Sequence, residues 1–177
     1  GGQGGTLVDT ACVLEAAALA MLPGPVLQSV TASAIAGLAD DTPARGRLLR
    51  RLAEGAPAAV ILPEHNDFRA TPTAQGWSVT GTCGPTLAAC SAQLILAAAH
   101  TDGQTVWLVL DTTQNGLGVE AGNGTDKTVD IGVVRLDGYT CRNNAVLQGI
   151  DEDHARSTTL ALTACAAAGT VRWCVQA

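Results

Sequence analysis

The sequence predicts an α+β protein. We expect a helical N-terminal segment, a middle domain that forms an antiparallel β-sandwich or barrel, and the start of a truncated C-terminal helical domain. Apolar residues recur at helical spacing in residues 7–54 and again after residue 151. Residues 58–147 instead contain short strand-like segments with no helical pattern between them, which is typical of antiparallel sandwiches and barrels. We therefore divide the chain into residues 1–57, 58–149 and 150–177.

The N-terminal segment contains three predicted helices, over residues 7–22, 26–38 and 43–54. Apolar residues three and four positions apart predict one buried stripe on the first helix, made of Leu7, Ala11, Leu14, Ala18 and Met21. Pro23 and Pro25 mark the break before the second helix. Thr42 suits the N-cap of the third helix, with Pro43 at its first helical position.

The middle segment contains six predicted strands: Ala58–Leu62, Trp77–Thr82, Leu94–Ala99, Val106–Leu110, Leu117–Ala121 and Val129–Leu136. The first strand is predicted to be buried, and the third is apolar throughout. Turn residues at Asp102-Gly103, Asn123-Gly124 and Asp137-Gly138 separate several of the strands.

A long helix is predicted at the end of the chain, with Asp151 or Asp153 as its cap. It carries an apolar stripe: Leu160, Ala164, Ala167, Val171 and Cys174 or Val175. We expect the helices at both ends to leave apolar surface that needs cover, and therefore an oligomer.

Composition and charge restrict the function. A net charge of −6 and an aromatic content of 3% argue against nucleic-acid binding. No apolar run is long enough to span a membrane, and the first residues do not form a signal peptide, so we expect a cytoplasmic protein. The six cysteines form no Cys-x-x-Cys pair and the three histidines are scattered, so we expect reduced, unbonded cysteines and no metal site.

Local motifs for chemistry are few. The sequence has no phosphate-binding glycine motif and no Gly-x-Ser-x-Gly nucleophile elbow. Residues 64–67 put four polar side chains after a buried strand, and these form either a solvated turn or a binding loop. Residues 151–154 contain three carboxylates and a histidine, which helix capping explains better than metal binding.

Six stretches carry a family resemblance: Gly1–Thr6, Met21–Pro25, Arg50–Gly55, Gly76–Thr82, Ala92–Thr101 and Leu136–Cys141. Their order and spacing resemble those of the acyl-CoA dehydrogenases of actinobacteria, over nearly the whole chain. The resemblance implies an FAD enzyme in which a carboxylate removes the α-proton of an acyl-CoA thioester and the β-hydride passes to the flavin. In that family the base comes from the C-terminal helical domain, so no residue of this chain is assigned as catalytic.

The resemblance also marks five cofactor-binding positions, in two stretches that correspond to the flavin-contacting strands of the family. Leu62 and Glu64 match the first stretch, where the family has a threonine that contacts the flavin. Pro85, Thr86 and Leu87 match the second stretch, where Pro85 replaces an aromatic residue and Leu87 replaces a hydroxyl residue. Ala88 stands where the family has asparagine. These departures indicate a degenerate flavin site.

Three interpretations follow from the resemblance. The chain could be a subunit of an FAD-dependent acyl-CoA dehydrogenase acting on lipid or steroid side-chain thioesters, as the degenerate partner in a hetero-oligomer. It could be a complete flavoenzyme subunit that holds FAD through backbone contacts, alone or as a homo-oligomer. It could also be a non-enzymatic scaffold that keeps the fold for assembly.

Overall fold

The computed structural model describes residues 5–176, so most of the predicted Gly1–Thr6 motif lies outside the described residues. Within this range the chain has four α-helices and one mixed nine-stranded sheet, which confirms the α+β prediction. The helices are α1 (Leu7–Leu19), α2 (Val26–Leu38), α3 (Pro43–Ala53) and α4 (Glu152–Gln176). The strands are β1 (Ala58–Ile61), β2 (Arg69–Thr73), β3 (Gly76–Thr82), β4 (Thr86–Leu87), β5 (Leu94–Thr101), β6 (Gln104–Asp111), β7 (Leu117–Ala121), β8 (Ile131–Arg142) and β9 (Val146–Leu147).

Side-chain caps mark the starts of α3 and α4. The Thr42 hydroxyl accepts a hydrogen bond from the Arg45 backbone N–H at 3.3 Å, and Pro43 occupies the first turn of α3, as predicted. Asp151 accepts from the His154 backbone N–H at 2.9 Å and so caps α4, which decides between the two predicted capping residues.

The predicted buried stripe of α1 is wrong in most positions. Only Leu14 is buried, while Leu7 and Met21 are exposed. The helix also ends at Leu19, and Met21 adopts a left-handed backbone conformation with φ 51°. The reason is that α1 packs mainly on one neighbour, α4, so one face of the helix is covered and the rest is free.

The sheet has the strand order β4-β8-β3-β2-β5-β6-β9, with β1 paired to β5 and β7 paired to β8. It is mixed rather than purely antiparallel, because β1 runs parallel to β5 from Ala58↔Leu94 to Ile61↔Ala97. The sequence patterns missed β2, β4 and β9. Two of these strands have only two residues, and β2 contains Pro72 and exposes four of its five residues.

Strand β5 lies between two hydrophobic cores. Ile95, Ala97 and Ala99 face the interior of the β domain, where they join Phe68 and Tyr139. The alternate residues Leu94, Leu96 and Ala98 face the helices, in a second core that includes Ile35 of α2 and Leu48 of α3. The continuous apolar run of this strand is therefore explained by burial on both faces.

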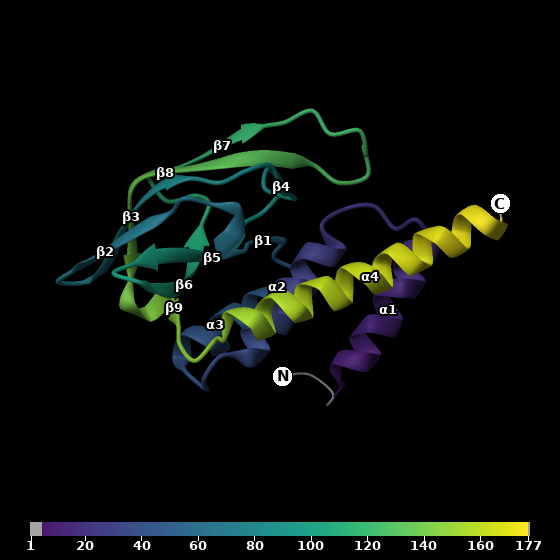
Figure 1. The fold of residues 1–177 in the computed structure, drawn as a ribbon, viewed down its shortest axis with the longest axis horizontal. Coiled ribbons are helices and arrows are strands. Elements are labelled where there is room, and N and C mark those ends of the chain that lie inside the picture. The colour runs from purple at the N-terminus through teal and green to yellow at the C-terminus, as the bar shows by residue number, and fades with distance from the viewer. Residues whose placement is uncertain (1–4, 177) are drawn as a thin grey trace.

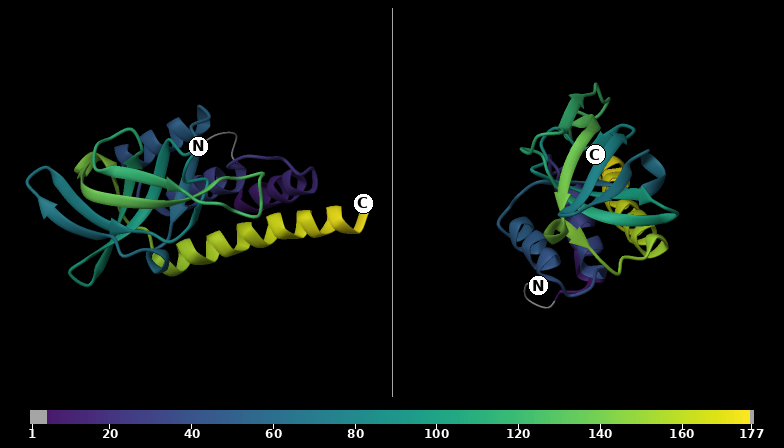
Figure 2. Two further views of the ribbon diagram at one scale, coloured as in Figure 1. Left: turned by 90° about the horizontal axis from the view of Figure 1, so that it is seen from above. Right: turned by 90° about the vertical axis from the view of Figure 1, so that its left-hand side faces the viewer.

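The helices gather on one side of the β domain, and α4 runs beyond the sheet along α1 (Figures 1 and 2). Gly169 of α4 is buried at this contact, where a Cβ atom would overlap the backbone carbonyl oxygen of Glu15. Arg172 forms an ion pair with the Glu15 carboxylate one turn further along. A glycine at position 169 therefore sets how closely the two helices approach.

All six cysteines are unbonded. Among the described residues, no helix has the length and hydropathy needed to cross a membrane.

We expect Gly169→Ala to destabilise the protein by about 1–3 kcal/mol, because the added methyl group must push α1 away from α4. The matched control is Gly46→Ala in α3, where a Cβ meets nothing within 4 Å. That control should stabilise the protein by up to about 1 kcal/mol through helix propensity. Urea unfolding of both variants measures the difference, and equal effects of the same sign would contradict the close contact.

Candidate functional site

The structure brings the two predicted flavin-contacting stretches together. Asn66, after β1, forms an antiparallel bridge with Cys83, after β3. The Gly84 backbone N–H donates to the His65 carbonyl oxygen at 2.9 Å. Residues that are about twenty positions apart in the sequence therefore form one continuous surface.

The first stretch contributes few side chains to this surface. The Leu62 side chain is buried in the core between the sheet and the helices. Glu64 points toward α4, where its Oε1 accepts from Nε of Arg156 at 2.9 Å. Burial would raise the pKa of Glu64, but a backbone hydrogen bond and the Arg156 guanidinium outweigh it and hold the pKa below its ordinary value. Glu64 therefore links the β domain to α4 as a carboxylate.

The second stretch has one hydroxyl, and it faces inward. Thr86 is 7% exposed, and its hydroxyl donates to the Gly84 carbonyl oxygen at 3.1 Å and lies 3.3 Å from the Cys83 sulfur. Pro85 is exposed and has no N–H to donate. Leu87 is 40% exposed and offers only aliphatic surface.

Ala88 adopts a left-handed backbone conformation with φ 63°, which alanine rarely adopts. Two hydrogen bonds fix it there: its N–H donates to the Asp130 carbonyl at 2.7 Å, and its carbonyl accepts from the Ala92 N–H at 3.0 Å. Glycine and asparagine suit this conformation, and asparagine is the residue that the family resemblance places at position 88. The backbone of the second stretch thus keeps a shape that its own side chain does not favour.

Sequence patterns did not identify the residues that hold this surface in place. The Asn66 amide donates to the carbonyls of Leu62 and Ala98, at 2.8 and 3.1 Å, and accepts from the Phe68 N–H at 2.7 Å. Asp130 accepts from the Cys90 N–H at 2.7 Å. Asn66 was visible only as one member of a polar loop, and nothing in the sequence pairs Asp130 with residue 90.

A cavity of about 320 Å³ lies next to the second stretch. Leu87 and Val129 line it from the β domain, and Leu14, Met21 and Ala166 line it from α1, the following turn and α4. The lining is largely apolar, so the cavity suits an aliphatic group better than a charged one.

The residues of this surface do not fit the flavin contacts that the resemblance implies. An isoalloxazine ring needs an aromatic or flat partner and hydrogen-bond donors at its edge. Here the side chains of Pro85 and Leu87 supply neither, and the Thr86 hydroxyl is already bonded within the loop. Between residues 5 and 176, no three metal-ligating side chains come together either.

We expect Ala88→Gly to be about 1 kcal/mol less destabilising than Ala89→Gly. Both alanines are buried, so both changes remove a buried methyl group and add freedom to the unfolded chain. Only position 88 also gains relief from a positive φ. Chemical denaturation of the two variants gives the comparison, and equal losses would mean that Ala88 is not strained.

No protein-family model matches the sequence, and a search of curated protein sequences finds no match. Solved structures do match, with 222 similar chains. PigA with FAD and proline has 15% identity and a TM-score of 0.81, over 98% of this chain and 52% of that chain. Butyryl-CoA dehydrogenase from Megasphaera elsdenii has 16% identity and a TM-score of 0.80, over 94% and 50%.

The ChsE4-ChsE5 complex from Mycobacterium tuberculosis has 18% identity and a TM-score of 0.73, over 92% of this chain and 44% of that chain. The chain thus spans about half the length of the structures that it matches. At these identities the likeness establishes the fold, and it confirms the predicted resemblance at that level. The chain has the acyl-CoA dehydrogenase fold over its N-terminal helices, its β domain and the helix that follows.

Proposed function

We propose that this chain is a subunit of an FAD-dependent acyl-CoA dehydrogenase, and that it is the partner whose own flavin surface is degenerate. One observation carries the proposal: hydrogen bonds hold Ala88 of the second stretch in a left-handed conformation that suits asparagine, while the side chains of Pro85 and Leu87 offer no ring contact. The reaction of the complex would be α,β-dehydrogenation of an acyl-CoA thioester of a lipid or steroid side chain. The catalytic base comes from outside the residues described here.

In the complex, this chain would form part of the wall of an apolar cavity and cover apolar surface there. The apolar cavity beside Leu87 would take aliphatic surface, either of the acyl group or of a neighbouring subunit. The ion pair between Glu64 and Arg156 joins the β domain to α4 elsewhere, outside the lining of that cavity. FAD, by this proposal, is held mainly by the partner subunit. That ChsE4-ChsE5 is a complex supports a partner of similar fold.

Domain organisation and cellular location are part of the same proposal. The chain would consist of the end of one helical domain (1–57), a β domain (58–149) and the first helix of a second helical domain (150–177). It would work in the cytoplasm.

The purified protein should bind FAD weakly. An absent aromatic contact and two absent hydroxyl contacts, each contributing about 1 kcal/mol, together weaken binding about a hundredfold. The double substitution Pro85→Trp and Leu87→Thr should recover about tenfold or more in affinity, measured by titration of flavin fluorescence.

The control pair is Pro72→Trp with Leu38→Thr, which makes the same two changes at exposed positions away from the second stretch. This pair should leave FAD affinity unchanged. Tight FAD binding by the unsubstituted protein would refute the degenerate site and favour a complete flavoenzyme that uses backbone contacts. If a partner chain assembles with the protein but the pair lacks dehydrogenase activity with FAD, the scaffold interpretation holds instead.

Light scattering should show an assembly larger than a monomer. The apolar stripe of α4 faces away from α1, and Leu160 and Val171 on it are 63% and 61% exposed. The double substitution Leu160→Glu and Val171→Glu should therefore lower the scattering mass without loss of helical circular dichroism. Ala161→Glu with Ala168→Glu is the control, because both alanines are exposed on α4 but off the stripe. A monomeric unsubstituted protein would contradict the proposed assembly.

A further inference from the structure

A second cavity, of about 480 Å³, lies between α3 and the strands β6 and β8. It shares no lining residue with the apolar cavity beside Leu87. It therefore needs an explanation that is independent of the surface marked by the family resemblance.

Positive charge distinguishes this cavity. Three arginines line it, Arg47 and Arg51 from α3 and Arg142 from the end of β8, against one carboxylate, Asp111. Among the described residues, Arg51 has an ion pair with Asp111 at 2.8 Å, whereas neither Arg47 nor Arg142 has a carboxylate partner. Arg47 instead donates to the neutral backbone carbonyl of Asn144. Two guanidinium charges are thus uncompensated, in a protein whose net charge is −6.

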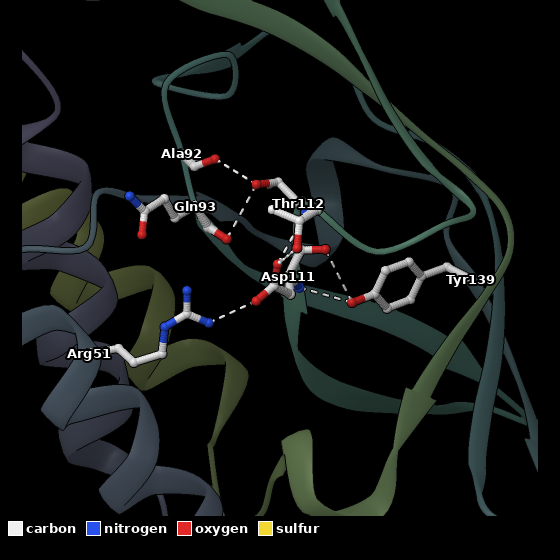
Figure 3. A network of polar contacts seen from close by, with 7 residues as sticks. Arg51, Ala92, Gln93, Asp111, Thr112 and Tyr139 are labelled. Carbon is white, nitrogen blue, oxygen red and sulfur yellow. Dashed lines mark hydrogen bonds and ion pairs between the residues drawn. The ribbon is translucent and has the colours of Figure 1, made fainter.

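A hydrogen-bond network makes the Arg51 side of the cavity rigid (Figure 3). Asp111 accepts from the Thr113 N–H at 3.0 Å and from its hydroxyl at 2.6 Å, and the Asp111 N–H donates to the Tyr139 hydroxyl at 2.8 Å. Thr112 donates from its hydroxyl to the Ala92 carbonyl at 2.9 Å and so anchors the same turn. Because Asp111 is held in this way, its charge is committed to Arg51.

The pKa values of the lining residues leave no further negative charge in the cavity. Burial would raise the pKa of Asp111, but the hydrogen bonds from Thr113 and Arg51 outweigh it and lower the pKa, so Asp111 is ionised and neutralises Arg51. Burial raises the pKa values of Tyr139 and Cys141 to about 12 each, so both groups stay uncharged at neutral pH. Arg47 and Arg142 therefore have no competing anion inside the cavity.

The rest of the lining includes an aliphatic part, made of Ala44, Leu48, Leu94, Val109 and Ala145, and two uncharged polar residues, Gln114 and Asn144. A cavity with an aliphatic floor and two unpaired guanidinium groups has complementary partners for both parts of an amphiphilic anion. The guanidinium forks match the two oxygens of a carboxylate, while the floor takes apolar surface out of water.

We propose that this cavity binds a small organic carboxylate with an apolar body, and that Arg47 and Arg142 hold its carboxylate. The site is distinct from the proposed flavin and acyl surfaces, and it does not depend on the proposed function. The volume is large enough for an aromatic or branched carboxylate of about ten carbons, with its carboxylate at the solvent-exposed Arg47 and Arg142.

The probe for the test is 2-naphthoate, followed by calorimetry and by its fluorescence, with uncharged 2-naphthamide as the matched ligand. We expect 2-naphthoate to bind and 2-naphthamide to bind at least tenfold more weakly. Arg142→Gln and Arg47→Gln should each weaken 2-naphthoate binding about tenfold or more, since each removes a charge-assisted hydrogen bond. Arg135→Gln, which changes an exposed arginine of the same strand β8 that pairs with Glu120, should leave the affinity unchanged.

Circular dichroism of each variant checks that it is folded. Equal binding of the carboxylate and the amide would overturn the proposal, because it would place the ligand in apolar surface alone. Unchanged affinity in folded Arg142→Gln and Arg47→Gln would also overturn it. Inorganic phosphate that competes with 2-naphthoate at equal concentration would overturn the role of the apolar floor, whereas failure of phosphate to compete supports it.

Discussion

The burial of β5 on both faces is the constraint on which the rest of this structure depends. Each residue from Leu94 to Ala99 contributes to one of two cores, in strict alternation. A strand that is apolar on both sides can be stable only if a second layer covers it, and here α2 and α3 supply that layer. Strand β1 pairs in parallel with β5 and connects it to the helices, so the helical segment and the β domain cannot separate without exposing this strand.

This arrangement fixes the position of the candidate site. The loop that follows β1 and the loop that follows β3 lie side by side, and they meet where Asn66 bridges Cys83. Backbone hydrogen bonds hold the second stretch. The Ala88 N–H donates to the Asp130 carbonyl, and the Ala92 N–H donates to the Ala88 carbonyl. Backbone bonds do not depend on side-chain identity. The shape of this loop therefore depends little on which side chains it carries.

Structural features that depend on residues close in the chain could be predicted from the sequence. Features that depend on contacts between distant residues could not. Thr42 and Asp151 cap helices through bonds to residues three positions away, so their role was readable from local patterns. The apolar run of β5 needed only its own composition. By contrast, β4 has two residues and exists because β8 pairs with it, forty-five residues later in the chain. The left-handed conformation of Ala88 is likewise held in part by a bond to the carbonyl of Asp130, which is distant in the chain.

The cavity lined by Arg47 and Arg142 also depends on residues that are distant in the chain. Here the sequence shows the charged residues but not which of them have partners. Arginines at positions 45, 47, 50 and 51 were readable as one basic face of a helix, which by itself describes an ordinary solvated surface. In the folded protein these arginines have different partners. Arg51 forms an ion pair with Asp111 at the end of β6, whereas Arg47 donates only to a neutral backbone carbonyl. Arg142 then approaches from β8, which no helical pattern could indicate. The excess positive charge of the cavity therefore depends on α3, β6 and β8 together. It lies where the helices meet the edge of the sheet, and the helix alone would not produce it.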